Sequence, residues 1–249
     1  MTCGKRKARH SLKRRMIFED FCKKNFNLSI SQWCSNLPEK SSAAIIVLYV
    51  VLNLFVPQCF SSLILRLTVA PWSALLLVCL YLCAVPGKLG KSCAFKKLEQ
   101  GSAVKVSSVL FLVLLLCFIS HYWSCEFFKF LGIAVKEKQY LAESLKNATV
   151  PEIIVIGVTT IIFAPIGEEI VFRRMLYGVL FPLGAVKALF LCSFFFSIAH
   201  FYLVGIIGLF FLALLLHLLY FNTRNIWCPI QVHMIFNALS FVSVLADKN

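Results

Sequence analysis

The chain has 249 residues, of which 60% are hydrophobic and only 14% charged, and its mean hydropathy is +0.84. A soluble domain of this length could not bury so much apolar surface, so the composition excludes a soluble globular protein and predicts an all-α polytopic membrane protein. The formal net charge is +14, and most of the polarity lies at the front of the chain.

The first 40 residues form a basic segment that contains ten Lys or Arg residues and three acidic ones. Four charged residues interrupt the apolar run from Phe18 to Phe26, so this segment lacks the hydrophobic region of a secretory signal peptide. We expect a retained cytoplasmic segment that acts as a topogenic signal or contacts anionic lipid headgroups. Next to a membrane span, binding of nucleic acid is the less favoured use of such a cluster.

The eleven cysteines are scattered, odd in number and mostly placed inside apolar runs. They form no CxxC pair, which argues against a disulfide framework and against a thiolate zinc site. We interpret them as small hydrophobic packing residues.

Seven apolar runs are long enough to cross about 30 Å of hydrocarbon. In chain order they cover residues 43–63, 67–85, 106–123, 153–180, 186–204, 206–220 and 226–245. The predicted organisation is therefore a basic segment (1–40), three N-terminal spans with an amphipathic connection (41–150), and a C-terminal part (151–249) that carries the chemically unusual residues.

Charge in the loops predicts the orientation of these spans. The loop 87–105 carries five lysines and one glutamate. If the basic head is cytoplasmic, seven spans put this loop, Lys187 and Arg224 on the cytoplasmic side, as the positive-inside rule requires. We expect a multi-pass protein of the plasma or inner membrane, with its C-terminus on the outer side.

Glu168 and Glu169 are the only two acidic residues between Ile153 and Ala246. Charged groups in such a sequence are costly unless they are paired or hydrated, which makes them functional candidates. Glu169 and Arg173 stand at i, i+4, so we predict an ion pair between them. Glu168 lies about 100° around the helix and is left free to act as a general base.

Depth counting predicts that His200 lies opposite Glu168. A turn at 181–185, with Pro182 and Gly184, separates the two residues, and each lies roughly 20 Å from it along its helix. His233 and Asn237, again at i, i+4, lie roughly 12 to 18 Å from the loop at 222–225. These side chains can therefore converge at one level of the membrane.

A purely structural interpretation applies to other polar or aromatic residues of these spans. An intramembrane histidine often bonds to a neighbouring helix, and we interpret His121 and His217 in this way. The aromatic residues between Phe190 and Phe201 are interpreted as packing. The cost of placing six polar residues in lipid favours a functional site for Glu168, Glu169, Arg173, His200, His233 and Asn237.

Three ordered motifs connect these residues with a known family. EExxxR runs from Glu168 to Arg173, FxxxH ends at His200, and HxxxN runs from His233 to Asn237. With these motifs, residues 151–245 resemble the CPBP (Abi) family of intramembrane proteases. This family includes the type II CAAX prenyl endopeptidases and bacteriocin-processing or self-immunity proteins.

The resemblance implies a role for each matching residue. Glu168 and His200 would activate the water that attacks a peptide carbonyl. His233 and Asn237 would stabilise the oxyanion, and the pair of Glu169 and Arg173 would hold the site together. The implied substrate is a membrane-associated protein or peptide in the lipid bilayer, whether prenylated or not, and the oligomeric state is left open.

The metal requirement and the function each have alternatives. The chain lacks HExxH, so we favour a glutamate-activated water without metal or other cofactor, although Glu168, His200 and His233 could hold zinc if all three turned to one point. A non-catalytic immunity or binding protein of the same fold, a transporter with a buried carboxylate–histidine site, and a regulatory scaffold are the other candidate functions. The polar residues cluster at one depth, and the sequence shows no paired broken helices in matching halves. Both observations favour the peptidase over the transporter.

Overall fold

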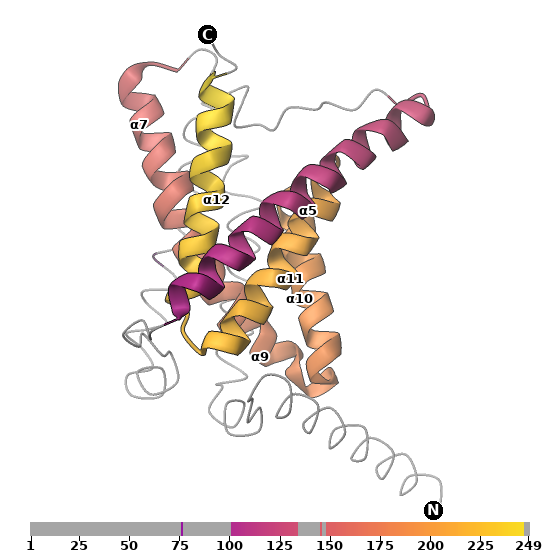
Figure 1. Ribbon diagram of the computed structural model, residues 1–249, viewed down its shortest axis with the longest axis vertical. Helices are drawn as coiled ribbons and strands as arrows, with labels where there is room; N and C mark the ends of the chain where they lie inside the picture. Colours follow the sequence, from indigo (N-terminus) through magenta and orange to yellow (C-terminus); the bar gives the residue numbers. More distant parts are fainter. Residues whose placement is uncertain (1–75, 77–100, 134–144, 146–147, 247–249) are drawn as a thin grey trace, which may run out of the picture.

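The fold was analysed in a computed structural model of the chain, which describes residues 76, 101–133, 145 and 148–246. The elements with bounds in this part are all helical, which confirms the predicted all-α class (Figure 1). They are α5 (Ser102–Phe130), α7 (Val150–Val158), η2 (Thr159–Phe163), α8 (Ala164–Ile170), η3 (Val171–Leu176), α9 (Tyr177–Leu180), η4 (Phe181–Leu183), α10 (Ala185–Ala199), α11 (Ile206–Thr223) and α12 (Trp227–Ala246).

Four helical stretches of the described part are long and apolar enough to cross a membrane. They are Ser102–Phe130, the continuous stretch Val150–Leu183, Ile206–Thr223 and Trp227–Ala246. The chain is thus an integral membrane protein. Apart from Leu76, the predicted spans 43–63 and 67–85 lie outside the described residues, so the total of seven spans stays a prediction.

The predicted span 186–204 is wrong at its C-terminal end, because α10 stops at Ala199. His200 is the C-cap, and its imidazole Nδ1 donates to the Phe196 carbonyl at 2.8 Å, while its backbone N–H points to Ile198. The side chain therefore takes the place of the backbone N–H of His200 itself, which would bond to the Phe196 carbonyl if the α-helix continued. Phe201 follows with a positive φ of 48°, which turns the chain out of the helix. Non-helical backbone inside a membrane is tolerated where it lies against protein or lines a wet cavity, so we expect one of these beside this turn.

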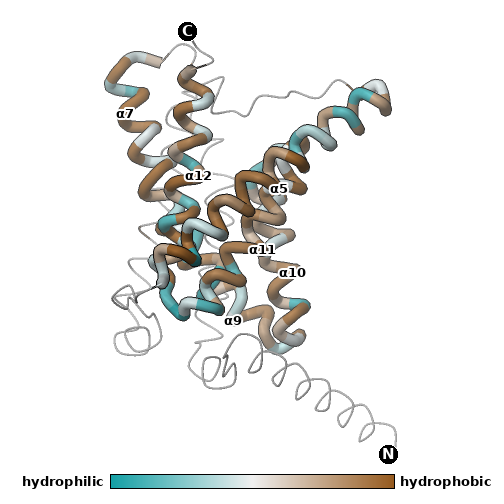
Figure 2. The backbone as a smooth tube through the Cα atoms, in the orientation of Figure 1, coloured by the Kyte–Doolittle hydropathy of each residue, from teal (hydrophilic) through white to brown (hydrophobic). Residues whose placement is uncertain are grey.

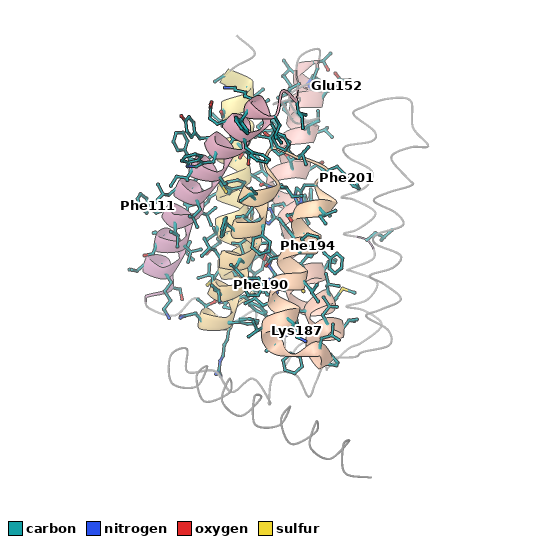
Figure 3. The ribbon with its side chains drawn as sticks, turned by 90° about the vertical axis from the view of Figure 1, so that its right-hand side faces the viewer. Phe111, Glu152, Lys187, Phe190, Phe194 and Phe201 are labelled. Atoms are coloured by element: carbon teal, nitrogen blue, oxygen red, sulfur yellow. The ribbon has the colours of Figure 1, made fainter. Side chains whose placement is uncertain are left out.

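The helices form a bundle in which α10 and α11 make an antiparallel hairpin, and α5 crosses α11 obliquely (Figure 1). The turn between α10 and α11 does not reach as far along the bundle as the start of α7 and the end of α12. Glu152, at the start of α7, and Lys187, at the start of α10, lie at opposite ends of the bundle (Figure 3). The helices α8, α10 and α12 therefore bring residues from three parts of the chain to the middle of the bundle.

Close packing of α5 against α11 depends on Gly208. A Cβ added there would lie 2.9 Å from Ser120 Oγ and 3.4 Å from Cys117 Cα, which is too close for an undisturbed contact. The main core cluster extends from this crossing to η3 and α10, and contains Val113, Phe172, Phe196 and Leu212 among others. In lipid, such interhelical contact is driven mainly by van der Waals packing.

Two π-helical segments, η2 and η3, flank the short helix α8, which carries both glutamates. Pro165 has no N–H to donate, and the N–H of Ala164 bonds to Thr159 O, one residue further back than in an α-helix. The Thr160 carbonyl therefore receives no hydrogen bond from Ala164, and Pro165 has no N–H to offer it. The widened turn leaves this carbonyl for a partner from another helix.

Polar residues interrupt the apolar helices at few places within the bundle. Figure 2 shows the polar residues of α8, η3 and α12 as hydrophilic segments of otherwise hydrophobic tubes. The other hydrophilic segments include the outer end of α5 and the connection between α11 and α12. The central set contains the residues of the candidate site.

Candidate active site

Glu169 is the anchor of the site and is completely buried. Its Oε2 lies 3.0 Å from Arg173 Nε, and its Oε1 lies 3.0 Å from His233 Nδ1. The ion pair predicted from the i, i+4 spacing is therefore present, although it acts through charge without an aligned hydrogen bond. Loss of one partner of a buried pair typically costs about 3–5 kcal/mol, so this link between α8, η3 and α12 stabilises the bundle centre.

The hydrogen bond to Glu169 also defines the orientation of His233. A carboxylate only accepts hydrogen bonds, so His233 Nδ1 carries the proton. The other ring nitrogen, Nε2, faces Glu168 at 3.8 Å from Oε2. The sequence did not predict the bond between His233 and Glu169, because it depends on the rotation of α12 about its own axis.

His200 approaches the same carboxylate oxygen from α10. Its Nδ1 donates to the Phe196 carbonyl, which leaves Nε2 to face Glu168 Oε2 at 3.8 Å. The expected proximity of Glu168 and His200 is therefore confirmed. The Glu168 and His200 side chains are 20% and 29% exposed, whereas His233 is 2% exposed. The site is thus open on the side of Glu168 and His200 and closed behind His233.

Glu168 differs from Glu169 in having no close partner of its own in the described part of the chain. Its Oε2 is buried and makes no hydrogen bond there, while two imidazole nitrogens face it at 3.8 Å. This distance is too long for a direct hydrogen bond and suits one bridging water. Such a carboxylate, aimed at a shared point, can exchange protons with a water held there.

Asn237 lies one turn after His233 on α12 but contacts a different element. Its Nδ2 donates to Thr160 O at 2.9 Å, the carbonyl that the widened turn of η2 leaves available. This bond ties α12 to the segment that precedes Glu168. The amide has a second N–H, so the oxyanion role implied by the resemblance stays a prediction.

Other buried polar groups lie around the site. His217 is completely buried and packs against Tyr177 and Phe221, with ring centroids 5.4 and 5.7 Å away. We predicted a hydrogen bond from His217 to a neighbouring helix. The described residues contain no such bond. His121 bonds within its own helix, to Cys125 at 3.7 Å, and makes no bond to another helix of the described part. In both cases, helical spacing alone could not show which face of the helix meets a partner.

Arg174 is a buried charge that the sequence analysis did not select. It is 3% exposed, and its guanidinium donates to the hydroxyl of Tyr220 at 3.1 Å. The signal was available, because two adjacent arginines in an apolar run are as costly as two adjacent glutamates. This contact links η3 to α11.

The donor set of Glu168, His200 and His233 is of the kind that zinc binds. No group of three or more His, Cys, Asp or Glu residues in that part is close enough to hold a metal ion. Two donors bound to one tetrahedral zinc at about 2.0–2.2 Å lie roughly 3.3–3.6 Å apart, so the 3.8 Å separations of Glu168 Oε2 from the two imidazoles are not far from those of a zinc site. The metal-free reaction therefore stays a prediction.

Comparison with known proteins identifies the class of the C-terminal part. Residues 150–239 match the family described as Type II CAAX prenyl endopeptidase Rce1-like. The match covers all three motifs, so the resemblance to the CAAX protease-like family is confirmed. No curated protein and no solved structure matches the chain.

Proposed function

We propose that this protein is an intramembrane endopeptidase that hydrolyses a peptide bond of a membrane-associated protein or peptide. The observation that carries the proposal is the convergence of two imidazole Nε2 atoms on the Glu168 carboxylate, each at 3.8 Å. The match of residues 150–239 to an endopeptidase family supports it. The partial exposure of Glu168 and His200 gives a substrate and water a route to the site.

In the proposed reaction, Glu168 is the general base. A water shared by Glu168 and His200 gives one proton to the carboxylate, while His200 Nε2 accepts the other hydrogen bond and orients the water. The water oxygen then attacks the peptide carbonyl carbon. When the tetrahedral intermediate collapses, the C–N bond breaks and Glu168 returns its proton to the leaving amine nitrogen.

His233 is proposed to stabilise the oxyanion. To donate through Nε2 while Nδ1 donates to Glu169, the ring must carry both protons. Glu169 at 3.0 Å and Glu168 at 3.8 Å supply the countercharge for an imidazolium, and Arg173 balances the second carboxylate. A preorganised donor of this kind typically contributes about 2.7–4 kcal/mol to transition-state stabilisation.

For the membrane, we propose that the end of the bundle that carries Lys187 is cytoplasmic. The start of α10 with Lys187 lies at one end and the start of α7 with Glu152 at the other (Figure 3). Excess positive charge favours the cytoplasmic side. Glu168 lies near the middle of the 34-residue stretch from Val150 to Leu183, so the reaction would take place deep in the bilayer.

The test is a comparison of protein termini in cells that express the wild-type chain or Glu168→Gln at equal levels. Glu168→Gln keeps the shape of the side chain but cannot accept a proton from water. We expect at least one membrane protein to show a new terminus with the wild type only. Identical termini in both cells would overturn the proposal, and Glu152→Gln, which changes a half-buried acid at the start of α7, is the matched control.

A further inference from the structure

Phe196 lies at the meeting point of the charged and imidazole groups of the site. It precedes His200 by one turn on α10 and is completely buried. Its sequence position gave no sign of more than packing, because it belongs to a run of three phenylalanines from Phe194 to Phe196. The other two members of this run are exposed, at 48% and 45%, so only Phe196 faces the bundle interior. Figure 3 shows Phe194 on the outer side of α10.

The Phe196 ring contacts three polar residues from three elements. Arg173 Cζ lies 5.1 Å from the ring centroid, the His200 ring 4.6 Å and the His233 ring 5.7 Å. The backbone of Phe196 adds a fourth link, since its carbonyl accepts the hydrogen bond from His200 Nδ1. One residue thus borders both imidazoles and the guanidinium.

The contact with Arg173 compensates for missing hydrogen bonds. The terminal nitrogens of this buried guanidinium have no hydrogen-bond partner in the described part of the chain. The face of an aromatic ring carries negative potential and attracts a cation placed over it, most strongly where water is excluded. Without the ring, Glu169 would remain as the close partner of Arg173 in the described part of the chain. The guanidinium could then rotate about its side-chain bonds.

The contacts with the histidines restrict the direction of their Nε2 atoms. His200 is held by the Phe196 carbonyl on one side and by the ring on the other, and His233 meets the ring edge-to-face at 63°. Edge-to-face contact of this kind is a favoured arrangement of aromatic rings. The ring therefore limits the rotation of both imidazoles toward Glu168.

We propose that Phe196 is a positioning residue of the peptidase site, whose aromatic ring holds Arg173, His200 and His233 in the arrangement that faces Glu168. This inference rests on the proposed function. It assigns the Phe of the FxxxH motif a role in orienting the reacting groups, in addition to its place in the core. Phe196 itself does not touch the reacting atoms and acts through the three residues around it.

The first experiment measures kcat and KM for Phe196→Leu in proteoliposomes, with a fluorogenic peptide that copies the bond found cleaved in cells. Leu keeps the site apolar and removes the ring. We expect kcat to fall roughly 10- to 100-fold while KM changes less than about threefold, because misorientation of catalytic groups affects the chemical step. Phe241→Leu, a buried phenylalanine that packs on Gly157 away from the site, is the matched control and should retain kcat.

The second experiment replaces Phe196 by phenylalanine with one, two or three ring fluorines, which weaken the ring's attraction for a cation and change its size little. We expect kcat to fall stepwise with each fluorine while the melting temperature stays within a few degrees. This series remains informative if Phe196→Leu fails to fold. A kcat that is unchanged across the series, in protein that Glu168→Gln inactivates, would overturn the role of Phe196 and leave the proposed function standing. Activity retained in Glu168→Gln would overturn the proposed function instead.

Discussion

His233 donates its Nδ1–H to Glu169 across 3.0 Å, and this one bond joins the last helix of the bundle to the helix that carries both glutamates. Because the bond fixes the position of the proton on His233, it also directs Nε2 toward Glu168. The two adjacent glutamates therefore have different tasks. Glu169 is part of a buried charge network, and Glu168 faces the point where a water would be activated.

This division predicts effects of very different size for two neighbouring substitutions on stability. Glu169→Gln leaves the buried charge of Arg173 uncompensated and should lower the free energy of unfolding by about 3–5 kcal/mol. Glu168→Gln removes a partly exposed carboxylate that lies 3.8 Å from the imidazoles, so it should lower stability clearly less than Glu169→Gln while activity is lost. Thermal unfolding in detergent micelles measures both.

A double substitution provides the control for the charge network. In Glu169→Gln with Arg173→Gln, no buried charge is left without its partner, so the double variant should be more stable than Glu169→Gln alone. Equal or lower stability of the double variant would contradict the role assigned to the ion pair.

His200 has two functions that can be separated by isosteric replacement. His200→Asn places an amide N–H near the position of Nδ1 and can still bond to the Phe196 carbonyl, so the end of α10 should be kept while activity is lost by at least about 100-fold. His200→Gln places its amide near Nε2 and loses the bond to Phe196, which should cost about 1 kcal/mol of stability. Circular dichroism melts and peptide cleavage distinguish the two. His121→Asn, on the outer face of α5, should resemble the wild type in both assays.

Several features of the site could be predicted from the sequence because they follow from distances along a single helix. The spacing of Glu169 and Arg173 predicted their ion pair, and depth counting from one turn predicted that His200 meets Glu168. Rotation of one helix relative to another is not written in such spacing. For this reason the bond from His233 to Glu169 and the central position of Phe196 became visible only in the folded chain.

Local backbone effects were equally hidden in the apolar pattern. The run that includes α10 continues to Val204, but the His200 side chain competes for a helical carbonyl and ends the helix at Ala199. Pro165 was visible in the sequence, yet the widened turn before it depends on which carbonyl the neighbouring N–H selects. Both departures from a regular α-helix lie beside site residues, where irregular backbone is frequent.

Zinc removal tests the interpretation of the donor set. In the proposed reaction the Glu168 carboxylate acts on water directly, so the protein should retain at least about 80% of its activity after dialysis against a strong chelator. Elemental analysis of the same sample should give well below one zinc per chain. Loss of activity on chelation that stoichiometric zinc restores would contradict the metal-free reaction.

Asn237 gives a test of the link between α12 and the π-helical turn before Glu168. Asn237→Asp replaces the donor to Thr160 O by a carboxylate that cannot donate and is repelled by the carbonyl, so stability should fall by more than the roughly 1 kcal/mol expected for Asn237→Ala. Activity should fall with both, because the turn positions Glu168. Ser240→Ala, which removes a bond to Phe236 within α12, should leave activity within about twofold of wild type. If Asn237→Asp is as stable as the wild type, the Thr160 contact does not hold the turn.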